Sequence, residues 1–163
     1  MTINVISNPE QVEALRAFRM IFRAVRRHYQ LIEKHAGISG AQTWALSLLM
    51  DQPGMTVSGL AQAMAIHQST ASNLIDKLVQ LGLTERVKDE ADLRVTYLHV
   101  TASGKQRLEG ISGPVTGLLP DAITRLDPEK LKRLNESLVD LLSMLSEVES
   151  EAAQIPLADI LRD

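Results

Sequence analysis

The sequence predicts a mainly α fold that carries one small β-hairpin. Apolar residues recur at three- and four-residue steps through residues 9–35 and again through residues 131–145, which is the spacing of amphipathic helices. A stretch at residues 93–100 instead alternates with a period of two, which is typical of a strand. At 163 residues and 45% apolar content, the chain is long enough for one core, or for a compact domain with an oligomerisation element.

The first two helices are separated by glycines. The periodicity over residues 9–35 predicts a long helix, which Gly37 ends. Ser39 then serves as the N-cap of a second helix over residues 41–50. The Asp-Gln-Pro-Gly run at residues 51–54 breaks the chain before the next element.

A short helix, a tight turn and a longer helix follow. Thr56 is a good N-cap for a helix that ends near Met64. Residues 65–67 form the turn, and the longer helix is predicted over residues 68–81. Gly82 follows it, where a left-handed backbone costs glycine little.

The residue pattern then changes to one that predicts a β-hairpin. Residues 83–88 and 93–100 favour strands, and the polar residues 89–92 form the turn between them. A further helix is predicted over residues 101–108. Glycines and prolines break up the following stretch, so no element is assigned to residues 115–125.

The last predicted helix begins at Asp127-Pro128-Glu129 and runs to about Ala153, with leucines at helical spacing. We therefore divide the chain into residues 1–38, 39–105 and 106–163. The middle part holds the helix pair and the hairpin, and the outer parts are helical.

Composition excludes several function classes. The chain has no cysteine, no run of about 20 apolar residues and no signal-peptide pattern at its start, so we expect a cytoplasmic protein that does not enter membranes. It has no glycine-rich phosphate loop and no nucleophile elbow, and its four histidines lack metal-ligand spacing. We expect no enzyme activity, no cofactor and no metal.

Helix, short helix, turn, longer helix and hairpin together make the plan of a winged helix-turn-helix, in which the second helix of the pair fits the DNA major groove. The sequence resembles the MarR (multiple antibiotic resistance regulator) family of bacterial transcription factors. The resemblance rests on residues 56–61, 68–78, 81–83 and Arg86, and on the wing residues 92–94 and 98–104.

The resemblance implies a homodimer, joined by the terminal helices, that binds a pseudo-palindromic operator in double-stranded DNA. It also implies repression that a small aromatic or anionic ligand relieves. The leucine-rich helix after Leu131 agrees with a dimerisation region, because its apolar face is larger than a monomer needs. Three residues depart from the family pattern: Asn73 stands at a usually basic position, Leu93 replaces a wing arginine, and His67 replaces a small cap.

The predicted DNA-binding side chains lie on the second helix of the pair and in the wing: Gln68, Ser69, Thr70, Ser72, Asn73, Lys77, Arg86, Lys88 and Arg94. Arg94 would enter a minor groove, and Asp92 would orient it. The simpler alternatives are that these polar residues only cap and solvate a helix, and that the wing pair is a local salt bridge.

The large residues around a possible effector pocket are Phe18, Phe22, Tyr29 and Trp44, for which plain core packing is the alternative. The arginine stripe of the first helix, at positions 16, 19, 23 and 27, is interpreted as a solvated face rather than a DNA contact. Formal charge is +2 over residues 1–54, zero over 55–105 and −5 over 106–163. This balance leaves open a second function, a winged-helix dimer that has lost DNA binding and docks a partner protein.

Overall fold

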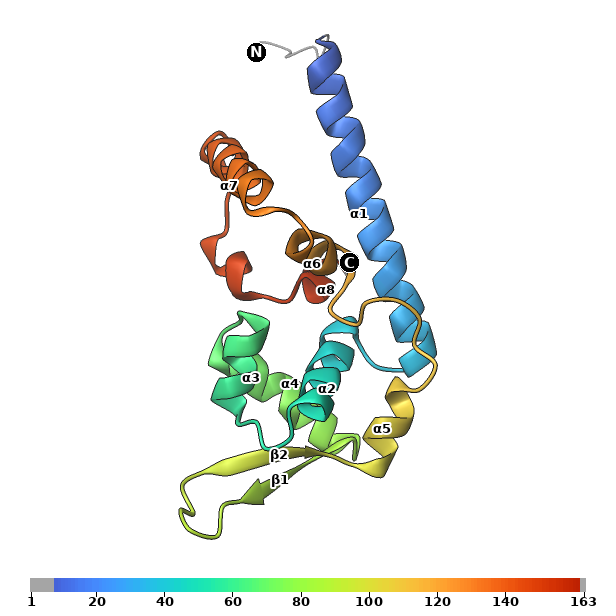
Figure 1. Cartoon of the computed structure of the whole chain (residues 1–163), viewed down its shortest axis with the longest axis vertical. Coiled ribbons are helices and arrows are strands. Elements are labelled where there is room, and N and C mark those ends of the chain that lie inside the picture. Colours follow the sequence, from blue (N-terminus) through green and yellow to red (C-terminus); the bar gives the residue numbers. More distant parts are fainter. Residues whose placement is uncertain (1–7, 162–163) are drawn as a thin grey trace.

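The computed structural model describes residues 8–161 of the chain, and it confirms a mainly helical fold with one two-stranded hairpin (Figure 1). The elements are α1 (Pro9–Ala36), α2 (Gly40–Asp51), α3 (Val57–Met64), α4 (Gln68–Gln80), β1 (Thr84–Lys88), β2 (Thr96–Val100), α5 (Ala102–Leu108), α6 (Leu118–Thr124), α7 (Pro128–Ser143), the 3₁₀ helix η1 (Ser150–Gln154) and α8 (Leu157–Ile160).

The helix boundaries are set by local capping, as the sequence predicts. Gly37 ends α1 in a left-handed conformation with φ of 68°. Ser39 and Gln42 form a reciprocal capping box at the start of α2, with hydrogen bonds of 2.8 and 3.2 Å. The Thr56 hydroxyl accepts from the Gly59 amide at 3.2 Å and caps α3.

We call the segment from α2 to β2 the reader. Its core is formed where α2, α3, α4 and the hairpin meet (Figure 1). The largest side chains of this core are almost fully buried. The central ones are Leu46, Leu60, Ile75, Leu78 and Leu98, each 0% exposed. These residues come from four elements, so the reader packs around one apolar centre.

The hairpin is antiparallel, with Thr84 opposite Val100 and Lys88 opposite Thr96. Its second strand begins at Thr96, three residues later than predicted. The prediction was wrong here because the connection folds on itself: the Asp89 amide donates to the Val95 carbonyl at 3.0 Å. On the other edge, the Leu98 amide donates to the Met55 carbonyl at 2.9 Å, which ties the hairpin to the loop before α3.

The chain between α5 and α6 runs back along α1. His28 Nε2 donates to the Pro114 carbonyl at 2.9 Å, and His35 Nε2 donates to the Glu109 carbonyl at the same distance. These two bonds fix the connection between the reader and the C-terminal part to the second half of α1. Beyond it lies α6, in the stretch to which the sequence assigned no element.

The leucine-rich helix is shorter than predicted, because α7 ends at Ser143 rather than near Ala153. Its last turn tightens: the Met144 and Leu145 amides donate to carbonyls three residues earlier, at 3.1 and 3.2 Å. Serines and a valine between residues 143 and 150 have low helix propensity, and glutamates there oppose the helix dipole. The chain instead folds into η1 and α8, which packs on α2 (Figure 1).

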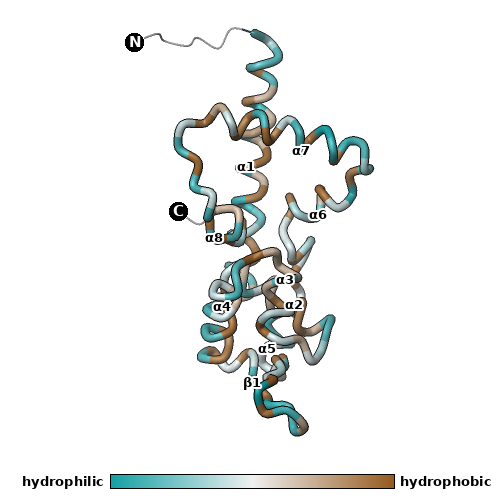
Figure 2. Tube along the Cα trace, turned by 90° about the vertical axis from the view of Figure 1, so that its left-hand side faces the viewer, coloured by the Kyte–Doolittle hydropathy of each residue, from teal (hydrophilic) through white to brown (hydrophobic). Residues whose placement is uncertain are grey.

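Helix α7 has no buried residue, and apolar and polar positions alternate along it (Figure 2). Its exposed apolar side chains are Leu134, Leu138, Val139, Leu141 and Leu142. Among residues 8–161, no helix is both long enough and apolar enough to cross a membrane.

Candidate nucleic-acid interface

Helix α4 has one buried face and one polar face. Ala71, Leu74, Ile75 and Leu78 are buried against the reader core. The opposite side carries the six predicted DNA-binding residues of this helix, all exposed or half-buried: Gln68, Ser69, Thr70, Ser72, Asn73 and Lys77. Packing of the apolar face therefore fixes the helix and leaves these polar side chains facing outward.

The first turn of α4 has no side-chain cap. His67 occupies the N-cap position, but its side chain makes no capping hydrogen bond. The first amides of a helix have no partner within the helix, and the helix dipole adds partial positive charge there. Such a helix end can accept an anionic group without a lysine or arginine.

The wing presents one arginine at its tip. The Arg94 side chain is 91% exposed, and its Nε donates to Asp92 Oδ1 at 3.1 Å. The same Asp92 oxygen accepts from the Arg94 amide at 3.0 Å. The expected pairing of Asp92 with Arg94 is thus confirmed, and the guanidinium remains free to point into solvent.

A second aspartate shapes the tip. Asp89 Oδ1 accepts from the amides of Ala91 and Asp92, both at 2.7 Å. These backbone hydrogen bonds lower the pKa of the Asp89 carboxyl below its ordinary value. The carboxylate therefore stays ionised near neutral pH and holds the loop in one shape.

Arg86 has a partner that the sequence did not reveal. Its guanidinium lies 2.8 Å from the Asp76 carboxylate, and both side chains are partly exposed. Asp76 belongs to α4 and Arg86 to β1, so the ion pair ties the helix to the wing. No spacing rule links the two positions, since they meet only after α4 and the hairpin have packed. Lys77 and Lys88 form no ion pair within residues 8–161.

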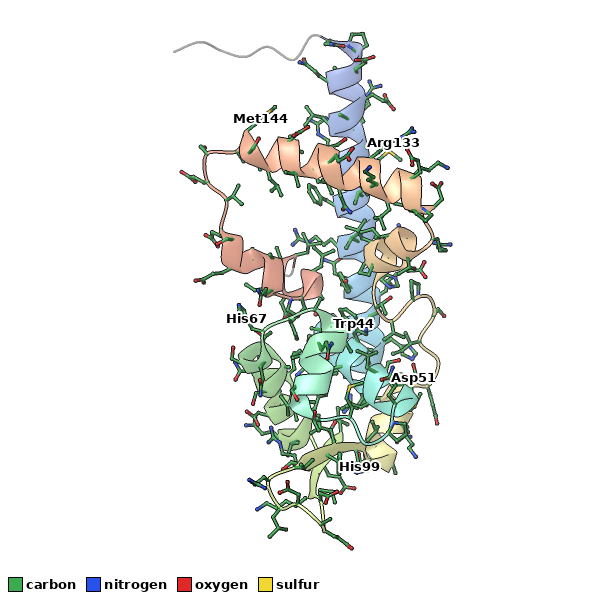
Figure 3. The ribbon with its side chains drawn as sticks, turned by 60° about the vertical axis from the view of Figure 1, so that its left-hand side comes forward. Trp44, Asp51, His67, His99, Arg133 and Met144 are labelled. Carbon is green, nitrogen blue, oxygen red and sulfur yellow. The ribbon has the colours of Figure 1, made fainter. Side chains whose placement is uncertain are left out.

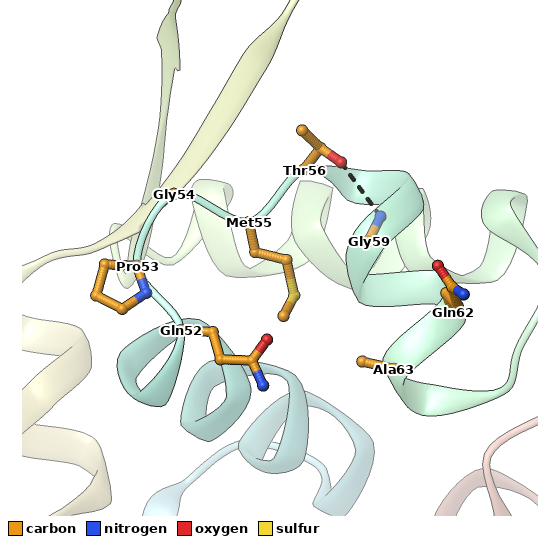
Figure 4. A pocket seen from close by; sticks show the side chains of 8 residues that line it. All are labelled: Gln52, Pro53, Gly54, Met55, Thr56, Gly59, Gln62 and Ala63. Atoms are coloured by element: carbon orange, nitrogen blue, oxygen red, sulfur yellow. Dashed lines mark hydrogen bonds between the residues drawn. The ribbon is translucent and has the colours of Figure 1, made fainter.

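Two of the hollows beside the reader are large enough to consider as ligand sites. One, of about 500 Å³, is open to solvent between the end of α2 and α3 (Figure 4). It is lined by Gln52, Pro53, Gly54, Met55, Thr56, Gly59, Gln62 and Ala63, and the Thr56–Gly59 cap lies at its edge (Figure 4). Its lining contains amides and backbone but no charged side chain, so it has little to hold a charged ligand.

The other hollow, of about 440 Å³, lies between α1, α2, α6 and the C-terminal segment. Tyr29 and Trp44 are among the residues that line it. Phe18 and Phe22 do not: they lie further up α1, stacked on each other with ring centroids 6.0 Å apart, and Phe22 is 53% exposed. The C-terminal segment, not the upper part of α1, closes this cavity.

The arginine stripe of α1 lies on the exposed side of the helix, at positions 16, 19, 23 and 27. Arg16 pairs with Glu13 at 3.6 Å. The first half of α1 extends away from the end of the molecule that carries the wing (Figure 1). This agrees with a solvated face. Within residues 8–161, no three His, Asp or Glu side chains gather closely enough to bind a metal.

Comparison with known proteins places the reader in a family. Residues 36–94 match the model of the MarR family. The chain is 26% identical over 141 residues to the helix-turn-helix transcriptional regulator YsmB of Bacillus subtilis, covering 86% of this chain and 95% of YsmB. It is 28% identical over 132 residues to a putative transcriptional regulatory protein for the hcr operon of Thauera aromatica, covering 78% and 75%.

Solved structures agree. The Staphylococcus aureus MepR–DNA complex matches with a TM-score of 0.55 and 25% identity, over 80% of this chain and 96% of MepR. A MepR variant bound to an oligodeoxyribonucleotide matches with a TM-score of 0.52 and 26% identity, over 80% and 96%. With its winged helix-turn-helix and its exposed polar helix, this chain is thus similar to transcriptional regulators along most of its length, and its residues 36–94 match the MarR family.

Proposed function

We propose that this protein is a homodimeric, sequence-specific repressor that acts in the cytoplasm on a pseudo-palindromic operator and is released by a small molecule. It acts by binding rather than by catalysis. The observation that carries this proposal is α4: its apolar side is buried in the reader, and its opposite side exposes an unbroken set of polar side chains beside the wing.

On DNA, α4 would enter the major groove with its N-terminal turn toward the base edges. The amides of Gln68 and Asn73 match the donor and acceptor pair of adenine, and the hydroxyls of Ser69 and Thr70 reach bases or phosphates. Arg94 would reach the neighbouring minor groove from the wing tip, with Asp92 limiting its directions.

The dimer is proposed from apolar surface that this chain leaves uncovered. Helix α7 exposes a row of leucines, and the first half of α1 exposes Met20 (72%) and Phe22 (53%). Exposed apolar side chains gathered on one helix in this way are typical of an interaction site. Pairing these faces between two chains would bury them and would hold two readers on adjacent half-sites, about one helical turn apart.

A dimer would also make up for the small number of unpaired basic side chains in a single reader. Basic and acidic residues balance over residues 55–105, and Arg86 already pairs with Asp76. A single reader thus makes few free cation contacts with phosphate, and counterion release contributes correspondingly little affinity. Linking two readers doubles the contacts without changing either one.

Ligand release is proposed from the position of the cavity beside Tyr29 and Trp44. The cavity lies between α1, which reaches toward the proposed dimer interface, and α2, which packs against α4. A ligand there would affect the joint between reader and dimer helices. It would weaken DNA binding only by favouring a reader spacing that no longer fits the operator.

In a second candidate function, the protein has the same fold but does not bind DNA. The balanced charge of the reader also suits a winged-helix dimer that docks a partner protein. The two functions differ in one measurable property, which is preference for one DNA sequence over others of equal length.

The test is fluorescence anisotropy of the full-length protein on the intergenic DNA upstream of its own gene and on random DNA of equal length, over a salt series. A preference of tenfold or more, removed by combining Asn73→Ala with Arg94→Ala, supports the repressor. Because a distant operator would escape this fragment, a selection of bound fragments from the whole genome follows. No enriched sequence in that selection would overturn the proposed function and favour the docking module.

A further inference from the structure

Two connections join the reader and α5 to the terminal helices, and neither of them is helical. Residues 37–39 link α1 to α2, and residues 109–117 link α5 to α6. Both contain glycines with a left-handed backbone: Gly37, Gly110, Gly113 and Gly117. A helix that continued through a connection would fix the direction of the segments on both sides of it. A turn at glycine does not, because glycine adopts many backbone conformations.

Apolar packing holds α1 close to the reader but leaves its direction less strictly defined. The second half of α1 packs on α2 and buries Val25, Tyr29 and Ile32. Burial of apolar surface is non-directional, whereas a hydrogen bond requires a defined distance and angle. The direction of α1 relative to the reader therefore depends on the hydrogen bonds that cross between them.

Thr101 joins the start of α5 to the chain that leaves α4. Its hydroxyl donates to the Gly82 carbonyl at 2.7 Å, and the same oxygen accepts from the Gly104 amide at 3.1 Å. The Thr101 amide donates to the Leu83 carbonyl at 3.1 Å. A Cβ added at Gly104 would overlap that Leu83 oxygen. Helix α5 thus begins in direct contact with the residues that follow α4.

Arg107 joins the other end of α5 to the end of α1. Its Nη1 donates to the carbonyl of Ala36, the last residue of α1, at 2.9 Å. The carbonyls of a last helical turn lack partners within the helix and carry partial negative charge, so a cationic donor suits them. Figure 3 shows α5 beside the strand that carries His99, below the lower end of α1. The seven residues of α5 are therefore bonded to a different helix at each end.

We propose that α5 is a strut between α4 and α1, and that Thr101 and Arg107, which hold its two ends, are positioning residues for operator recognition. The strut fixes the direction of α4 relative to α1, and in a dimer it fixes the spacing at which two readers meet DNA. The proposal rests on the proposed function in one respect, that α4 reads DNA while the terminal helices join two chains. Neither positioning residue contacts DNA.

Four variants separate the strut from other effects. Thr101→Val keeps the shape of the side chain and removes both hydroxyl hydrogen bonds, whereas Thr101→Ser keeps a hydroxyl. Arg107→Met keeps a long side chain and removes the donor to Ala36. Lys105→Met removes a positive charge from an exposed position of the same helix and is the matched control.

The strut is tested first without DNA, by pulsed electron paramagnetic resonance on the full-length protein. The chain has no cysteine, so Gln30→Cys on α1 and Gln80→Cys on α4 provide two unique and exposed sites for nitroxide labels. Labelled chains are diluted with unlabelled ones, so that the measured distance lies within one chain. Its distribution reports how strictly the direction of α4 is fixed relative to α1.

We expect the distance distribution to widen about twofold in Thr101→Val and in Arg107→Met, because a helix bonded at one end only is free to tilt. Thr101→Ser and Lys105→Met should match the original protein. The combined loss variant should be no wider than either one alone, because a strut released at one end no longer connects the two helices. Unchanged widths, with native circular dichroism, overturn the strut, and so does a combined widening equal to the sum of the two.

The role in recognition is tested by selecting bound duplexes from a pool of random DNA. The original protein should enrich pairs of one half-site at a single spacing. Arg107→Met should enrich the same half-site at several spacings, whereas Lys105→Met should keep the single spacing. A single spacing in Arg107→Met overturns the role in recognition and leaves the proposed function standing. If the original protein enriches no sequence, the proposed function fails and this role fails with it, while the label distances still decide whether the strut exists.

Discussion

The reader and α7 are both rich in leucine, yet they use it in opposite ways. In the reader, leucines from α2, α3, α4 and β2 meet at a closed centre and are fully buried. In α7, the leucines recur at helical spacing but none is buried, and Leu138 remains 37% exposed. An amphipathic pattern therefore predicts that a helix has an apolar face. It does not predict which segment or molecule packs against that face. The reader completes its own core, whereas the apolar side chains of α7 stay exposed in the single chain.

The largest effect is expected where the core is complete. Leu60→Ala should lower the free energy of unfolding by about 3 kcal/mol, because it removes a fully buried side chain and leaves a cavity. Urea denaturation of the original protein and of the variant, at equal concentration, measures this change in the free energy of unfolding. Val87→Ala, at a 44% exposed position of β1, is the control and should change it by less than about 1 kcal/mol. Similar losses for both would mean that the reader core is not the main source of stability.

The next-largest effect is expected on dimer affinity, at the exposed apolar face of α7. Leu138→Asp should weaken the proposed dimer about a hundredfold, which is about 2.7 kcal/mol, because it places a charge within an apolar interface. Sedimentation equilibrium measures the dimer constant, and circular dichroism checks that the reader stays folded. Arg133→Asp introduces the same side chain on the opposite side of α7 at an exposed position, and the dimer should persist. A dimer that tolerates Leu138→Asp would place the interface elsewhere.

A smaller effect is expected at the wing tip. Arg94→Ala should weaken binding to the operator about tenfold, since a guanidinium in a minor groove supplies part of the specificity. Anisotropy titrations on operator and random DNA measure both affinity and preference. Arg16→Ala removes an arginine from α1, far along the chain from the reader, and should leave the operator affinity nearly unchanged. Equal losses in the two variants would indicate general electrostatic attraction instead of wing recognition.

The smallest effect concerns the ion pair between α4 and β1. Asp76→Asn and Arg86→Ala should each cost less than about 1 kcal/mol of stability, because exposed ion pairs contribute little. If the pair positions the wing, both variants should bind the operator about twofold to threefold more weakly. A rise in affinity for Asp76→Asn alone would show instead that Arg86 acts through DNA phosphate once it is released.

Much of the candidate interface could be predicted because its signals are local. The cap at Thr56, the stop at Gly82 and the two-residue period of the wing depend on neighbours a few positions away. The pairing of Asp92 with Arg94 is local in the same sense. The features that the sequence did not reveal depend on tertiary packing: Arg86 meets Asp76 only across packed elements, and the C-terminal segment closes the cavity beside Trp44.

By itself, the sequence determined the order of the elements, the ends of α1 to α4, and the polar face of α4, because hydrogen bonds and side-chain periodicity within a few residues set these. Only the tertiary structure decided which side chains enclose the space beside Trp44, and that Gly40 seats the C-terminal segment. Those features depend on close approach between segments more than a hundred residues apart. No local pattern records such an approach, since it follows from the whole chain packing at once.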